Sequence, residues 1–90
     1  MRDSFELKKL ADVAGEQLHQ LVTVVYQEAK ENNGLTQTQL AGMIGVTQSN
    51  ISKILAKKNL SVVEAASLLA AMGKKLSFTI SKLNTDTPRD

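Results

Sequence analysis

The chain has 90 residues, an ordinary apolar content of 42% and a net charge of only +2. This length suits one domain, and the high surface-to-volume ratio of so short a chain favours an oligomer. The absence of cysteine excludes a disulfide scaffold and a thiolate metal site, and it suits a reducing compartment. The sequence shows no signal peptide and no apolar run of membrane-spanning length, so we expect a cytoplasmic protein without a membrane partner.

Charge is unevenly distributed along the chain. Residues 1–45 carry four basic and six acidic side chains, whereas residues 46–90 carry seven basic and three acidic ones. A basic half favours a nucleic-acid partner, although a solvated lysine face explains the same asymmetry.

A long N-terminal helix is predicted for residues 3–33, because Asp3 can cap its start and Gly34 can end it. Gly15 permits either one continuous helix or two helices that meet there, since a helical glycine costs only about 1 kcal/mol against alanine. Apolar residues recur in steps of three and four, which predicts a buried stripe. Its members are Leu7, Leu10, Ala14, Leu18, Leu21, Val25 and Ala29.

Three shorter helices are predicted in residues 34–73. Thr36 can cap the first, Gly45 can turn the chain in a left-handed conformation, and Thr47 can cap the second. Ser61 can cap a third, broadly apolar helix that ends at a glycine. The inward positions are expected at Leu40, Ala41, Ile44, Ile51, Ile54 and Leu55, and then at Val62, Ala65, Ala66, Leu68, Leu69 and Met72.

The period of the apolar residues changes to two in residues 75–82, where Leu76, Phe78 and Ile80 alternate with hydroxyl side chains. This pattern predicts a half-buried strand. No other segment has a strand pattern, and a lone strand cannot satisfy its own backbone, so we expect it to pair antiparallel with the same strand of a second subunit. Residues 84–90 are expected to form a loose polar tail.

The second short helix has an outer face of hydrogen-bonding side chains without an acidic residue. Side chains of this kind can read base edges in the major groove of double-stranded DNA, and glutamine can bond bidentately to adenine. Lys57 and Lys58 in the following loop fit phosphate contacts or an ordinary solvated loop. The candidate DNA-binding residues are Gln37, Thr47, Gln48, Ser49, Asn50, Ser52, Lys53, Lys57 and Lys58.

Five residues, Gln37, Ala41, Gly45, Ile51 and Ile54, resemble in type and spacing the helix-turn-helix of the phage repressor and Cro family, often called the XRE family. The resemblance implies a mainly α, lambda-repressor-like bundle and a homodimeric, sequence-specific repressor. It also implies that the first glutamine grips a phosphate and braces a glutamine, here Gln48, at the start of the recognition helix.

The ending of the chain, residues 60–80, is similar to that of HigA-type and HipB-type antitoxins, which bind toxins and repress their own operons. The sequence therefore leaves two alternatives for the repressor, an antitoxin and a phage or plasmid regulator. The contrasting expectation is a protein-interaction module that has the helix-turn-helix shape without DNA binding. No catalytic triad, cofactor motif or metal-ligand cluster is visible, and we expect no enzyme.

Residues 3–14 extend beyond what the helix-turn-helix requires. An apolar stripe on this extension must be covered, because exposed stripes of that kind are a liability. Packing on its own domain, a second copy of the chain, and a toxin partner are the three alternatives. The stripe consists of Leu7, Leu10, Val13 and Ala14.

Overall fold

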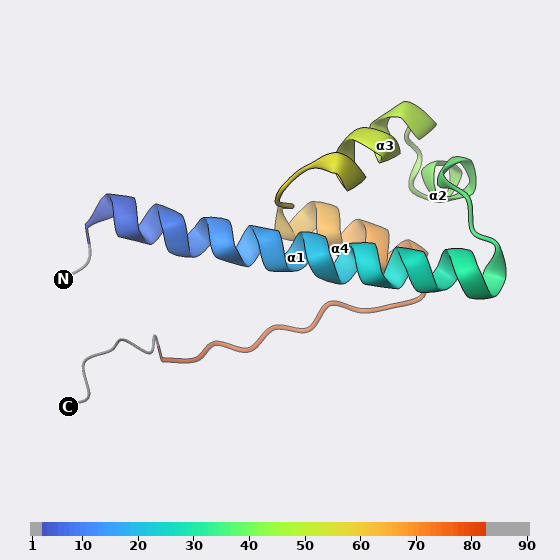
Figure 1. The fold of residues 1–90 in the computed structure, drawn as a ribbon. Helices are drawn as coiled ribbons and strands as arrows, with labels where there is room; N and C mark the ends of the chain where they lie inside the picture. The colour runs from blue at the N-terminus through green and yellow to red at the C-terminus, as the bar shows by residue number, and fades with distance from the viewer. Residues whose placement is uncertain (1–2, 83–90) are drawn as a thin grey trace.

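The computed structural model describes residues 3–82, so the tail predicted for residues 84–90 lies outside the described part of the chain. Between residues 3 and 82 four helices follow one another, which confirms the mainly α class (Figure 1). The three shorter helices gather around the C-terminal half of the first, whose N-terminal part extends past them. The helices are α1 (Ser4–Asn33), α2 (Gln37–Ile44), α3 (Gln48–Ala56) and α4 (Val62–Ala71).

The helix ends are set by local hydrogen bonds. Thr36 and Gln39 form a reciprocal capping box at the start of α2, and Ser61 and Glu64 form another at the start of α4. Gly34, with a φ of 69°, ends α1 in the left-handed conformation that glycine adopts without steric cost. These caps satisfy backbone groups that a helix end leaves without a partner.

Gly15 does not interrupt α1, which is one continuous helix of 30 residues and about 45 Å. Instead the glycine marks a close contact. The loop between α3 and α4 crosses the helix there, and Leu60 N donates a hydrogen bond to Gly15 O (3.0 Å). A Cβ atom on residue 15 would lie only 2.7 Å from Asn59 Cβ. The glycine is therefore needed for the approach of the loop.

The core lies between the C-terminal half of α1 and the three shorter helices. Val22, Leu40, Ile51 and Leu68 are its largest fully buried side chains. Tyr26 of α1 is also buried, with 8% of its surface exposed. The remaining buried members are Ala41, Leu60, Ala65 and Leu69.

The prediction that the apolar stripe of α1 is buried in the core is wrong for part of the stripe. Leu18, Val25 and Ala29 are half-buried, but Leu21 is 53% exposed and lies outside the core. Steps of three and four residues describe a second apolar face of α1 as well as the first, and the pattern alone does not say which face the other helices cover. On α4, Val62 is likewise exposed rather than buried.

The C-terminal segment, residues 74–82, forms no helix or strand in the described chain. It runs back along α1 in the opposite direction, on the side away from α2 and α3 (Figure 1). Leu76 packs against the core, whereas Phe78 is 68% and Ile80 98% exposed. A strand needs a neighbouring strand for its hydrogen bonds, and the rest of the described chain is helical or loop. Strand pairing between subunits therefore stays a prediction.

Candidate nucleic-acid interface

A tight turn at Gly45 joins α2 to α3. Gly45 has a φ of 76°, and Val46 N donates to Ala41 O (3.0 Å), which closes the end of α2. Ala41 is 3% exposed, and its small side chain lies in the core. Ile51 is fully buried on the inner face of α3. The turn and the inner face together hold α3 against α2 with its other face outward.

The outer face of α3 begins at its N-terminal cap. Thr47 Oγ1 accepts a hydrogen bond from Asn50 N (3.1 Å), which satisfies a backbone donor in the first turn. The predicted base-reading side chains are all solvent-exposed, so they are accessible to a groove of DNA. They are Thr47, Gln48, Ser49, Asn50, Ser52 and Lys53.

Two glutamines join the helices across the turn. Gln48 Nε2 donates a hydrogen bond of 2.6 Å to Gln37 Oε1. A primary amide has two N–H donors and one carbonyl acceptor. One N–H and the carbonyl oxygen of Gln48 are then left over, which are the donor and acceptor that the N7 and N6 edge of adenine requires. The Nε2 group of Gln37 can still donate to a phosphate.

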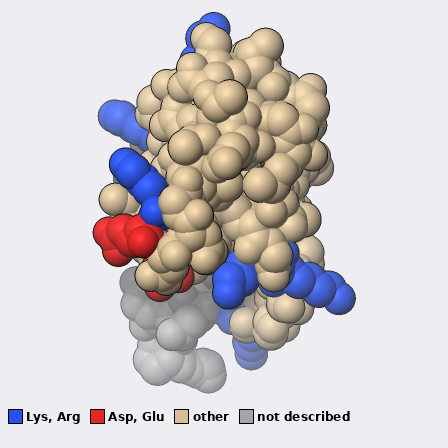
Figure 2. Space-filling model, turned by 90° about the vertical axis from the view of Figure 1, so that its right-hand side faces the viewer, with Lys and Arg blue, Asp and Glu red and all other residues tan. Residues whose placement is uncertain are grey.

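The charge around this face is low. In Figure 2 the upper part of the molecule, which α2 and α3 form, is almost entirely uncharged, with basic side chains at its margins. Lys53 is the one charged residue of the two helices, and neither carries a carboxylate that would repel phosphates. The side chains of this face can read bases by hydrogen bonds, but the two helices offer few basic groups for contacts with phosphates.

The two loop lysines lie in different surroundings. Lys57 Nζ is 2.6 Å from Glu64 Oε2, and this ion pair tethers the end of α3 to the first turn of α4. The Lys57 ammonium, together with the Ser61 backbone N–H, holds the pKa of the Glu64 carboxyl below its ordinary value. A phosphate contact by Lys57 would have to compete with this pair. Lys58 is exposed beside it.

His19 of α1 supports the far end of α3. Its Nε2 lies 2.7 Å from the carbonyl oxygen of Leu55, so this nitrogen carries the hydrogen and donates it. The last carbonyls of a helix have no partner within the helix, and His19 provides one. The sequence gives no signal for this contact, because it joins two residues that are 36 positions apart in the chain.

The sequence profile of a helix-turn-helix family matches residues 27–78 of the chain, from the end of α1 through the C-terminal segment. The chain belongs to the XRE-type helix-turn-helix family. Family members are DNA-binding regulators of transcription, and α2 and α3 of this helix-turn-helix protein form the motif. No curated protein and no solved structure matches the chain.

The five residues that carry the resemblance occupy the positions that the motif needs. Ala41 and Ile51 are buried, and Ile54 is half-buried against the core. Gly45 makes the turn, and Gln37 contacts Gln48. The remaining predicted site residues lie elsewhere. The exposed stripe of Leu7, Leu10, Val13 and Ala14 lies in the N-terminal part of α1, and Leu76, Phe78 and Ile80 belong to the C-terminal segment, which runs along α1.

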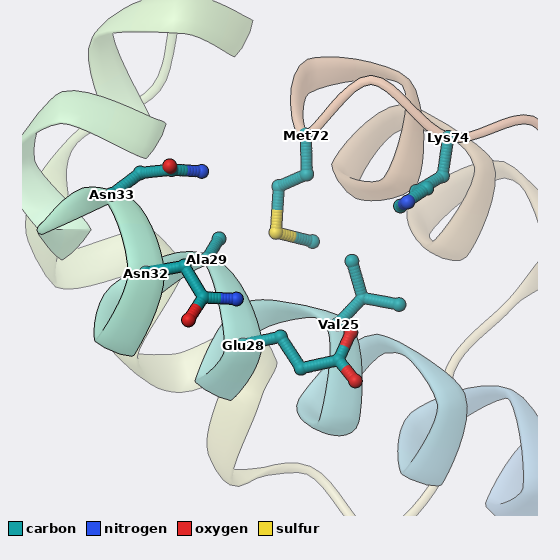
Figure 3. A pocket seen from close by; sticks show the side chains of 7 residues that line it. All are labelled: Val25, Glu28, Ala29, Asn32, Asn33, Met72 and Lys74. Carbon is teal, nitrogen blue, oxygen red and sulfur yellow. The ribbon is translucent and has the colours of Figure 1, made fainter.

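A small hollow of about 150 Å³ lies between the end of α1 and the end of α4 (Figure 3). Met72 after α4 and Val25 of α1 point into it from opposite sides, and the polar side chains around it include Glu28 and Lys74. Between residues 3 and 82, no three His, Cys, Asp or Glu residues gather as metal ligands. In the same range no helix has the length and apolar character that crossing a bilayer requires.

Proposed function

We propose that this helix-turn-helix protein is a sequence-specific transcriptional repressor that binds double-stranded DNA as a homodimer on an inverted-repeat operator. The observation that carries the proposal is the hydrogen bond between Gln48 and Gln37 at the exposed start of α3. It orients an amide that can read adenine while a second amide can hold the adjacent phosphate. The two recognition helices of a dimer would then enter successive major grooves about 34 Å apart.

The decisive experiment selects binding sites from random duplexes at low salt and then compares variants on the selected site. Gln48→Ala should cost about 1–3 kcal/mol on that site and much less on random DNA. Thr38→Ala is a matched control, because Thr38 is an exposed residue of α2 outside the predicted contacts. Equal losses on both DNAs would show that Gln48 does not read sequence.

The homodimer part of the proposal includes pairing of residues 75–82 as antiparallel strands. Phe78 and Ile80 are free to contact a second subunit because both are exposed, whereas Leu76 already packs on its own core. Phe78→Ser with Ile80→Ser should weaken the dimer without unfolding the monomer. Sedimentation equilibrium that shows an unchanged dimer would refute strand pairing.

The antitoxin form of the proposal makes the protein one half of a toxin–antitoxin pair, and the other form makes it a phage or plasmid regulator. Both predict the same DNA contacts, so the gene next to this one separates them. A small toxin-like reading frame there supports the antitoxin form.

The second candidate function is a protein-interaction module that does not bind DNA. The low charge of α2 and α3, where Lys53 is the one charged residue, favours it. Phosphate contacts supply most non-specific affinity, so a face with few basic groups binds random DNA weakly. Failure to recover any duplex from the selection at low salt would favour this candidate over the repressor.

A further inference from the structure

The exposed face of α1 carries a second stripe with a regular spacing, in which five of the six side chains are apolar. Its positions follow one another in steps of three and four residues over the helix, and all are solvent-exposed. Leu7 is 53%, Leu10 40%, Leu21 53% and Val24 57% exposed. The full stripe, which we call the α1 seam, consists of Leu7, Leu10, Ala14, Gln17, Leu21 and Val24.

We propose that the α1 seam is the surface on which a second copy of this chain docks, with the two α1 helices antiparallel. Strictly alternating steps of three and four are the spacing of a coiled-coil seam, which buries its residues against another helix. The described part of the chain offers no such helix, because α2, α3 and α4 cover the other face of α1. The proposal rests on the homodimer of the proposed function, and it holds whether or not that dimer binds DNA.

The order of residues along the seam is self-complementary when a two-fold axis passes between Ala14 and Gln17. Leu7 of one copy then faces Val24 of the second, and Leu10 faces Leu21. At the centre, the small Ala14 faces the longer Gln17. Each contact occurs twice by symmetry, as an isologous interface requires. A parallel pairing would instead place alanine against alanine and amide against amide.

A carboxylate flanks the α1 seam at each end. Glu28 occupies the next position in the spacing after Val24, and Asp3 caps the helix before Leu7. Carboxylates at these positions stay in water, since burying an unpaired charge is costly. Between them the seam holds no charged side chain, so docking desolvates only apolar groups and one amide.

The seam alone is too small for a stable dimer. Its length is about 27 Å and one helix is about 10 Å wide, which covers roughly 300 Å², whereas a standard interface buries about 800 Å² per partner. The C-terminal segment supplies more apolar surface beside it. Leu76 and Phe78, with Ala14, Gln17 and Leu21 of the seam, line a groove of about 370 Å³.

The same two-fold axis accommodates the C-terminal segments. Each segment runs antiparallel to its own α1 (Figure 1), so two antiparallel α1 helices bring the segments antiparallel to each other. The two-fold axis of an antiparallel helix pair is perpendicular to the plane that contains both helices. It therefore keeps the two C-terminal segments on the same side of that plane. Phe78 and Ile80 of the two copies therefore extend the interface that the seam begins.

The test uses cysteine cross-linking of the full chain, which has no cysteine of its own. Leu10→Cys and Leu21→Cys are made as separate single variants at exposed positions, so neither disturbs the core. Under mild oxidation, a mixture of the two variants should form a covalent dimer, while each variant alone should not. Val63→Cys, at a 74% exposed position of α4 outside the seam, measures random cross-linking.

Sedimentation equilibrium provides the second measurement. Leu10→Ser with Leu21→Ser should raise the dimer dissociation constant at least about tenfold, with Val63→Ser as the unchanged control. Circular dichroism checks that each variant remains helical. A single variant that cross-links with itself would overturn the antiparallel pairing. A wild type that stays monomeric, a dimer that survives the double serine change, or a stripe occupied by a different protein such as a toxin would overturn the proposal.

Discussion

Replacing glycine by alanine at two helical positions should change stability in opposite directions. Gly15 lies in α1 against Asn59, whereas Gly42 lies in α2 where nothing beyond its chain neighbours and its own helix backbone comes within 4 Å of the place where its Cβ would be. Alanine gains about 1 kcal/mol over glycine inside a helix, because glycine loses more backbone entropy on folding. At the open position this gain is the whole effect, so Gly42→Ala should raise the free energy of unfolding by about 1 kcal/mol.

At position 15 the new methyl group meets the α3–α4 loop. It would lie 2.7 Å from Asn59 Cβ, an atom that moves only with its backbone, and the next residue's N–H is bonded to Gly15 O. Overpacking of this kind costs about 1–3 kcal/mol. Taking the middle of that range and subtracting the helical gain, Gly15→Ala should lower the free energy of unfolding by about 1 kcal/mol.

Urea unfolding followed by circular dichroism at 222 nm measures both effects at one fixed protein concentration. In thermal melts each change corresponds to a shift of about 4–8 °C for a domain of this size, upward for Gly42→Ala and downward for Gly15→Ala. Asn59→Gly removes the contacting atom, so it should rescue Gly15→Ala in a double-variant cycle. If Gly15→Ala stabilised the protein as much as Gly42→Ala does, the loop would not be packed against α1.

Three further predictions follow from individual contacts. If Lys53 holds a phosphate, Lys53→Ala should lower by about one unit the slope of the logarithm of the DNA-binding constant against the logarithm of the salt concentration. Lys57→Ala should leave that slope unchanged. Because it breaks the ion pair with Glu64, it should instead lower the free energy of unfolding by up to about 1 kcal/mol. Because the pKa of Glu64 is lowered in the fold, its ionised carboxylate stabilises the protein at pH values above the ordinary glutamate pKa of about 4.3. Glu64→Gln should therefore be less stable than the wild type at pH 7, and this difference should shrink as the pH falls below about 4.3. Urea unfolding at several pH values measures the difference. His19→Ala should lower the free energy of unfolding by about 1 kcal/mol in the same assay, because it removes the hydrogen-bond donor to Leu55 O. Gln27→Ala, at an exposed position of α1, is the neutral control. An equal loss of stability in the two variants would contradict the role of His19.

Local features of this fold could be predicted from the sequence because they depend on residues three or four positions apart. Thr36 and Ser61 cap α2 and α4 as predicted, and each forms a capping box with the residue three positions on, Gln39 and Glu64. Gly45 turns the chain between the two motif helices in the left-handed conformation that was predicted. The contact between Gln37 and Gln48 was implied by the resemblance and is present. Their roles toward DNA stay predictions, since they depend on a partner molecule.

Tertiary structure decided the features that depend on which surfaces meet. The sequence shows apolar residues on two faces of α1, and only the packing of the other helices shows that Val22 and Tyr26 face the core while Leu10 and Leu21 do not. The sequence left open whether the first helix continues through Gly15; it does, and only the crossing α3–α4 loop shows why a glycine stands there. Spacing along a helix reports which residues share a face, but a face becomes core only when a distant part of the chain, or a second chain, packs against it.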